Sequence, residues 1–196
     1  MPARYRDKIV AYLQKNDSNF FTDHRRASIG SGKLINGQSV LLVSFHGPYK
    51  MKAETKIENF RNFLIFVDAV KKRLGCNLVL IGADTNLIQG NGIDDFMRDN
   101  ERLLSKCQLM FLNYKVRKPL HRHDKVKIDA IIYSSGGLIQ SRSDVQVYDV
   151  GHDDVLDHHP LSVELEVNSA AVNYSAKSKN YNLRRSASYP AGLSYW

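Results

Sequence analysis

The sequence predicts an α/β (α+β) fold in which strands and helices alternate before the chain turns mostly to strands. Two apolar runs, at 40–43 and 78–81, have the length and the Val and Leu content of strands buried inside a sheet. Between them, the apolar residues of 54–74 recur every three or four positions, the spacing that lines one face of a helix. A strand, a helix and a second strand in this order are typical of α/β proteins.

The other elements are less regular. Residues 1–39 show the weakest pattern, although the apolar content of 9–13 favours a strand. A second, weaker helix is expected at 93–104. Turn residues such as Ser-Gly-Gly at 135–137 then separate four strand-like runs, at 108–113, 126–134, 145–150 and 161–167.

Length and composition favour one domain with a tail. A chain of 196 residues with 43% apolar content is long enough for one sizeable core and too short for two comfortable ones. Residues 168–196 contain four basic residues, no acidic residue and no apolar periodicity. We therefore expect one domain at 1–167 and a basic, disordered tail at 168–196.

Charge and cysteine content indicate the setting in which the chain works. Lys and Arg outnumber Asp and Glu by 28 to 20, which favours a polyanionic partner. Cys76 and Cys107 have no metal-ligand spacing and lie next to apolar stretches, so we expect buried free thiols. No signal-peptide pattern and no apolar run long enough to span a membrane is present, which predicts an intracellular protein, nuclear or cytoplasmic.

Four short polar segments follow the ends of apolar runs. They are Ser-Phe-His-Gly-Pro at 44–48, Gly-Ala-Asp-Thr-Asn at 82–86, Lys-Ile-Asp-Ala-Ile at 127–131 and Asp-His-His-Pro at 157–160. Buried strands gather in one core, so groups at their ends can converge on one rim. The side chains expected to share this rim are His46, Asp84, Asn86, Asp129, Asp157 and His158.

In this order the segments resemble conserved blocks of the endonuclease/exonuclease/phosphatase family. Residues 82–86 are similar to the family's Gly-Asp-Phe-Asn block, with one residue inserted before the aspartate and Thr85 in place of the aromatic residue. Residues 127–131 resemble the basic-Ile-Asp-Tyr-Ile block. Residues 157–160 resemble the Ser-Asp-His-x-Pro block, with Leu156 where serine is usual.

His46 stands where many deoxyribonuclease-like members of the family carry a catalytic histidine, and the whole resemblance covers about residues 25–166. It implies a four-layered α/β sandwich. It also implies a hydrolase that cleaves phosphodiesters or phosphomonoesters with a divalent cation, Mg²⁺ or Mn²⁺.

The resemblance also implies a role for each residue. Asp84 would orient or deprotonate the attacking water, and Asn86 would hold the phosphate by hydrogen bonding. His158 would act as acid or base, with its imidazole held by Asp129. Asp157 would bind the cation, a hard ion that prefers carboxylate oxygen.

Plainer interpretations stay open for two of these residues. An aspartate before an asparagine after a buried strand is also typical of a turn or a helix cap, which could account for Asp84. His46 is as well explained by a strand-end residue bonded to backbone as by catalysis.

A basic segment at 115–127 precedes the Asp129 block. It contains six basic groups against one acidic group, which suits a phosphate backbone, although a solvated loop explains it equally well. The residues proposed to bind substrate there, nucleic acid or another phosphoester, are Lys115, Arg117, Lys118, Arg122 and Lys125.

One family feature is missing. Members of the family open with a strand carrying a metal-site asparagine and a second strand ending in Gln-Glu, whereas the first glutamate of this chain is Glu54, at the start of the predicted helix. We therefore expect that the sequence lacks the N-terminal part of the domain. Two functions follow: a metal-dependent phosphoesterase, with a nuclease favoured by the basic segment, or a weak or inactive nucleic-acid-binding or interaction module on the same fold.

Overall fold

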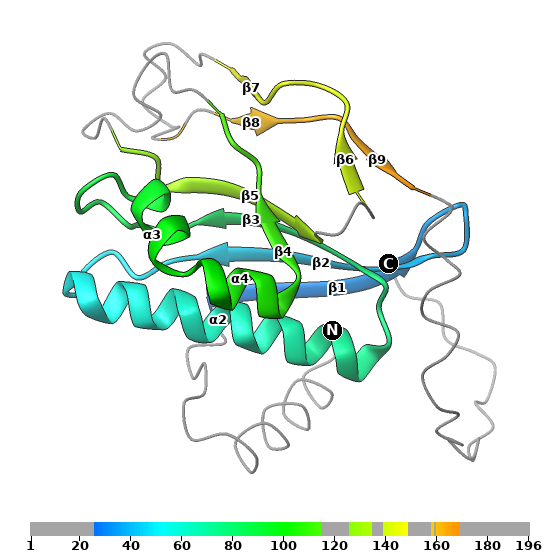
Figure 1. Cartoon of the computed structure of the whole chain (residues 1–196), viewed down its shortest axis with the longest axis horizontal. Helices are drawn as coiled ribbons and strands as arrows, with labels where there is room; N and C mark the ends of the chain where they lie inside the picture. The colour runs from blue at the N-terminus through cyan, green and yellow to red at the C-terminus, as the bar shows by residue number, and fades with distance from the viewer. Residues whose placement is uncertain (1–25, 115–125, 135–138, 149–157, 159, 169–196) are drawn as a thin grey trace, which may run out of the picture.

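The computed structural model describes residues 26–114, 126–134, 139–148, 158 and 160–168. Its centre is a five-stranded sheet with the order β1-β2-β3-β5-β4 (Figure 1). The strands are β1 (Ala27–Lys33), β2 (Ser39–His46), β3 (Leu78–Asp84), β5 (Asp129–Ser134) and β4 (Leu109–Phe111). Strands β2 and β3 are parallel, and the other neighbours in this sheet pair antiparallel.

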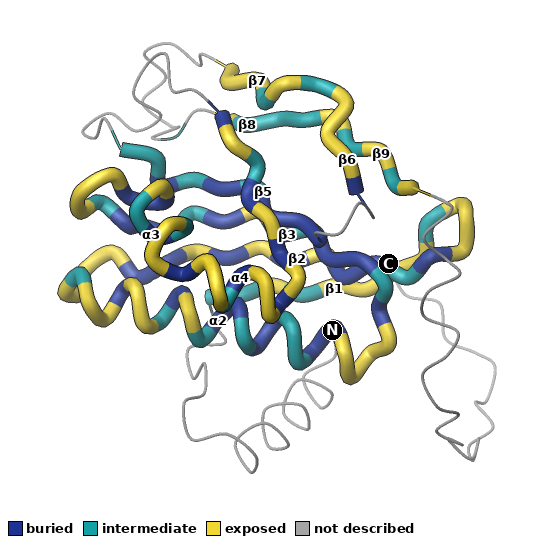
Figure 2. The backbone as a smooth tube through the Cα atoms, viewed as in Figure 1, coloured by how far each residue is buried: buried dark blue, intermediate teal, exposed yellow. Residues whose placement is uncertain are grey.

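Helix α2 (Ala53–Leu74) joins β2 to β3 and covers one face of the sheet. Its inner side chains include Phe60 and Phe63, both fully buried, and the Phe63 ring stacks on Phe45 of β2 with 4.1 Å between ring centres. Figure 2 shows the buried backbone concentrated in the central strands and on the side of α2 that faces them. The helix ends at Gly75, whose left-handed φ of 64° is easily adopted by glycine.

The predicted helix at 93–104 is instead two short helices, α3 (Ile93–Asp99) and α4 (Glu101–Cys107). The break falls at Asn100, whose φ is −123°. Its side-chain amide donates to the Phe96 carbonyl over 2.8 Å and accepts from Arg61 of α2 over 2.5 Å. These side-chain bonds replace continuous helical bonding, so the single-helix prediction was wrong.

Two small pairs of strands lie over the other face of the sheet, one made of β6 (Ile139–Ser141) and β9 (Leu165–Val167), the other of β7 (Gln146–Val147) and β8 (Leu161–Ser162). Ile139, Leu165 and Val167 pack with Val40 and Leu78 in a second apolar cluster. The single strand expected at 161–167 is therefore two, because its halves pair with different partners. The described residues thus form three layers: helices, main sheet and paired strands.

Most other predictions agree with the structure. The helix begins one residue before the expected 54–74, and strands lie within 108–113, 126–134 and 145–150. Strand β1 lies within 1–39, the part of the chain with the weakest sequence pattern. The strand expected at 9–13 falls outside the described residues, as does nearly all of the predicted tail.

The cysteine prediction is confirmed, because Cys76 and Cys107 are both free and buried. Burial raises the pKa of the Cys107 thiol to about 11, which leaves little reactive thiolate at neutral pH. None of the helices formed by the described residues is long and apolar enough to cross a membrane.

Candidate active site

The site begins with three strand residues that face one another in register. Pairing of β2 with β3 sets His46 opposite Asp84, and pairing of β3 with β5 sets Asp84 opposite Asp129. The three residues therefore form one row across adjacent strands at one end of the sheet. His46 and Asp84 end their apolar strands, and Asp129 begins one, so each lies where the sequence changes between polar and apolar residues.

His158, three residues before β8, completes this row. Its Nδ1 lies 2.9 Å from Asp129 Oδ2, and its Nε2 lies 3.8 Å from Asp84 Oδ2. His46 approaches the same Asp84 oxygen from the other side, with 3.4 Å between Nε2 and Oδ2. Asp84 thus lies between two imidazole rings. The His158 side chain is 27% exposed and that of His46 67%, so solvent can reach both.

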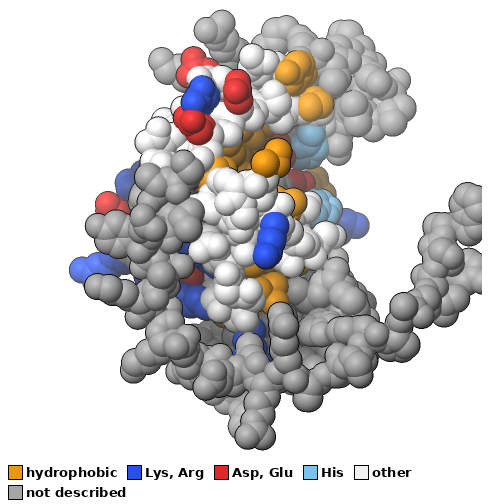
Figure 3. All heavy atoms as spheres, turned by 90° about the vertical axis from the view of Figure 1, so that its right-hand side faces the viewer, with side chains coloured by type: hydrophobic (Ala, Val, Ile, Leu, Met, Phe, Trp, Pro, Cys, Tyr) orange, Lys and Arg blue, Asp and Glu red, His pale blue; other side chains and the backbone are white. Residues whose placement is uncertain are grey.

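The described histidines, drawn pale blue in Figure 3, lie near one edge of the view, with acidic side chains in red between them. The arrangement is open to the surface. The cluster lies at one end of the main sheet, where the sequence predicts that these side chains converge.

A tight turn fixes the orientation of the Asp84 carboxylate. One carboxylate oxygen accepts the backbone N–H of Asn86 over 3.0 Å, and the other accepts its side-chain amide over 3.2 Å. The same amide donates to the Gly47 carbonyl over 3.0 Å, which joins the end of β2 to the turn. Asn86 has a left-handed φ of 53°, a conformation that asparagine tolerates better than most residues.

Thr85, at the position of the family's aromatic residue, points into the protein. It is 1% exposed, and its hydroxyl donates to the Ile128 carbonyl over 2.7 Å. Its backbone N–H donates to the same carbonyl over 2.8 Å. The turn after β3 is therefore bonded to the segment that enters β5, which keeps Asp84 and Asp129 together.

Sequence reasoning missed Lys56, a buried lysine behind the turn. It is 2% exposed, and its ammonium group donates to the Asn86 carbonyl over 3.1 Å. This bond satisfies a carbonyl that the left-handed turn directs into the protein. The signal in the sequence is its position, because Lys56 lies four residues before Phe60 in the buried stripe of α2.

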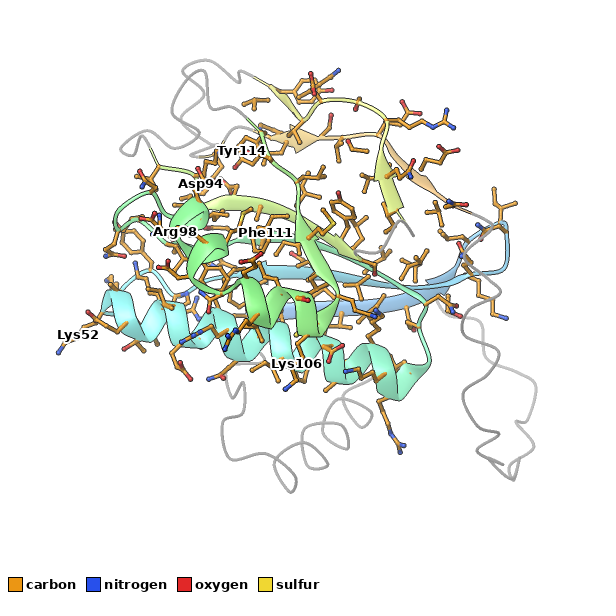
Figure 4. The ribbon with its side chains drawn as sticks, viewed as in Figure 1. Lys52, Asp94, Arg98, Lys106, Phe111 and Tyr114 are labelled. Carbon is orange, nitrogen blue, oxygen red and sulfur yellow. The ribbon has the colours of Figure 1, made fainter. Side chains whose placement is uncertain are left out.

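Tyr114 was missed as well. Its hydroxyl donates to the backbone carbonyl of Asp129 over 2.5 Å. Burial raises the pKa of Tyr114 well above its ordinary value, with smaller contributions from the Asp129 and Asp94 carboxylates, so the hydroxyl stays protonated as a donor. Figure 4 shows Tyr114 and Asp94 on neighbouring segments, and Lys127 contacts both, with its Nζ 3.1 Å from Asp94 and 5.3 Å from the Tyr114 ring centre.

The donors required for a divalent cation are incomplete in the part of the chain that the structure describes. No group of three or more His, Cys, Asp or Glu side chains there is arranged to hold a metal ion. Both oxygens of Asp84 already accept hydrogen bonds from Asn86. The predicted ligand Asp157 and the predicted substrate-binding residues fall outside the described residues, the latter being Lys115, Arg117, Lys118, Arg122 and Lys125.

No family model and no curated protein sequence matches this chain. Solved structures do match it. The human Nocturnin catalytic domain, solved with a bound sulfate anion, has a TM-score of 0.54 at 13% identity, covering 72% of this chain and 53% of that one. An endonuclease/exonuclease/phosphatase protein from Bacteroides vulgatus has a TM-score of 0.50 at 17% identity, covering 72% and 55%.

The chain has the endonuclease/exonuclease/phosphatase fold. The resemblance drawn from the four polar segments is thus confirmed at the level of the fold, including the mixed α/β architecture with a central sheet. The chain spans about half the length of these solved structures.

Gly47 has no side chain, which allows the ends of β2 and β3 to approach closely. A Cβ at this position would lie 2.2 Å from the Thr85 carbonyl oxygen, so Gly47→Ala must push the turn away from β2. We expect a loss of about 1–3 kcal/mol in the free energy of unfolding, measured by denaturant titration.

Gly82→Ala is the matched control. Gly82 lies in β3, two residues before Asp84, and a Cβ there meets no atom within 4 Å. Its variant should be as stable as the natural chain or slightly more so. Equal stability of the two variants would contradict the close packing of Gly47 against Thr85.

Proposed function

We propose that this chain carries the catalytic site of a phosphoesterase that hydrolyses phosphodiester bonds, with nucleic acid as the favoured substrate. The observation that supports this most strongly is the row formed by Asp129, His158, Asp84 and His46. It contains a histidine held by one carboxylate and directed toward a second, the arrangement expected of an acid–base pair.

The contact between Asp129 and His158 would fix the proton on the imidazole. An ionised carboxylate only accepts hydrogen bonds, so His158 donates its Nδ1–H to Asp129 across the observed 2.9 Å. Nε2 is then left on the side of Asp84, ready to accept or donate a proton. This is the tautomer that a general acid or base at this position requires.

Hydrolysis needs one bond formed and one broken. A water oxygen would bond to phosphorus, its proton would pass to Asp84 or His158, and the ester P–O bond would break as the leaving oxygen gains a proton. His46, on the other side of Asp84, lies where it can contact the non-bridging oxygens or the leaving group. Asp84 and the two imidazoles beside its carboxylate oxygen thus offer both a base and an acid.

Asn86 fits a positioning role better than direct phosphate contact. Its amide nitrogen donates to Asp84 and to the Gly47 carbonyl, which uses both N–H groups, and the residue is 5% exposed. Its amide would therefore act through Asp84, by holding the carboxylate toward the two histidines.

The cofactor expectation, Mg²⁺ or Mn²⁺, stays a prediction based on Asp157. The described side chains do not make a complete cation site, so the proton transfers above are assigned only to groups of this chain. The second candidate function is a nucleic-acid-binding or interaction module with little catalysis. The engagement of both Asp84 oxygens by Asn86 favours it, since those oxygens are then less available to a cation.

Substitution of the central pair tests the catalytic proposal. We expect Asp84→Ala and His158→Ala each to lower the single-turnover rate of oligonucleotide hydrolysis by about 10²- to 10⁴-fold, because each removes a proton-transfer group. Asp99→Ala is the matched control, since Asp99 is an exposed carboxylate of α3, 64% exposed and bonded to Arg98. Full rates in both site variants, or no hydrolysis by the unaltered chain, would contradict the proposal and favour the binding module.

Calorimetric titration tests the cation expectation. We expect Mg²⁺ to bind this chain only weakly, with Kd in the range of about 1 mM or above, because a hard cation prefers several oxygen ligands and the described residues form no complete set of them. Asp157→Ala should remove the remaining heat of binding, while Asp99→Ala should not change it. Micromolar binding that survives Asp157→Ala would show that other carboxylates hold the ion.

A further inference from the structure

An exposed strip with an aromatic ring follows the end of β2 that carries His46. Residues 49–52, here called the Tyr49 strip, connect β2 to α2 and read Tyr-Lys-Met-Lys. All four residues are exposed, Tyr49 by 64% and Met51 by 42%. Tyr49 follows His46 by only three residues, so the ring is close in sequence to the row of catalytic candidates.

The base of the strip is fixed in place. Gly47 and Pro48 are buried, and the Gly47 carbonyl accepts the Asn86 amide over 3.0 Å and the Arg26 guanidinium over 3.3 Å. After the strip the chain enters α2 at Ala53. The strip is therefore a short bridge between two ordered elements, and its position relative to Asp84 is set by the same turn that orients that carboxylate.

Lys56 links the Tyr49 ring to the site. Its ammonium group lies 5.7 Å from the centre of the ring and 3.1 Å from the Asn86 carbonyl oxygen. A lysine at this distance attracts the ring by a cation–π interaction and holds it near the turn. The ring is thus separated from the Asn86 carbonyl by one ammonium group, while most of its surface stays open to solvent.

The charge of the strip matches one kind of ligand. Lys50 and Lys52 flank Met51, both are exposed, and Figure 4 shows Lys52 pointing away from the protein at the start of α2. Two lysines next to an open aromatic ring are suited to a chain of alternating phosphates and bases. Phosphates favour the ammonium groups, and every base has a flat face that can stack on tyrosine.

We propose that Tyr49 is a stacking platform for an unpaired base of single-stranded nucleic acid, with Lys50 and Lys52 contacting the neighbouring phosphates. The position of that base beside the scissile phosphate rests on the proposed function. Single strands are specified because a base inside a duplex has both faces covered by its neighbours and cannot offer one to the ring. The platform deepens the proposed function by naming the substrate class of the site.

Binding without hydrolysis tests the platform. Fluorescence anisotropy of the full chain in EDTA compares labelled oligo-dT with an oligonucleotide of equal length made of abasic residues, which has the same phosphates and no bases. Tyr49→Ala should weaken oligo-dT binding by about tenfold and abasic binding by less than about twofold, and Tyr49→Phe should restore oligo-dT binding. Lys50→Ala should weaken binding of both.

Tyr148→Ala is the matched control, since Tyr148 is also an exposed tyrosine, 50% exposed, and contacts Gln146 and Ser162 in the layer of small strands. It should leave both affinities unchanged. An equal loss for the two oligonucleotides with Tyr49→Ala, no loss for either, or no oligo-dT binding by the natural chain would each overturn the platform.

The outcomes also separate the platform from the catalytic proposal. If the natural chain hydrolyses oligonucleotides while Tyr49→Ala binds oligo-dT normally, only the platform fails. If Tyr49→Ala loses oligo-dT binding selectively while no variant hydrolyses anything, the platform stands as a binding site and the catalytic proposal fails.

Discussion

The site depends on the register in which β2, β3 and β5 pair. Because the side chains of a strand alternate between its two faces, a slip of one residue would move Asp84 away from both His46 and Asp129. The register is strongly specified, since one face of these strands is buried under α2 and the same alternation places Phe45 and Ile81 in that core. The same strand register therefore sets both the apolar packing against α2 and the alignment of the polar residues at the rim.

Hydrogen bonds from buried side chains hold the rim residues in place. Lys56 binds the turn after β3 from the helix side, and Tyr114 binds the backbone of β5 at Asp129. Both residues are buried and neither belongs to the row of candidates itself. Supporting contacts of this kind keep a carboxylate and an imidazole within hydrogen-bond distance, which proton transfer requires.

The elements that the sequence predicts well have long or simple patterns. The three- and four-residue spacing of α2 persists over six turns. A change from apolar to polar residues marks the ends of β2 at His46 and of β3 at Asp84, and the reverse change marks the start of β5 at Asp129. The break at Asn100 depends on a bond from Arg61, 39 residues away, so no local pattern reveals it. The small strands β8 and β9 are two and three residues long, and their partners define them. Lys56 was overlooked because lysine is normally a surface residue.

The central claim is that Asp129 holds His158 with its proton on Nδ1. Long-range ¹H–¹⁵N NMR of the imidazole rings measures this directly, with the His158 signals assigned from a His158→Gln variant. We expect the neutral ring to carry its proton on Nδ1, and Asp129→Ala to shift the population toward the Nε2–H tautomer. A neutral His158 that carries its proton on Nε2 in the natural chain would contradict the proposed arrangement.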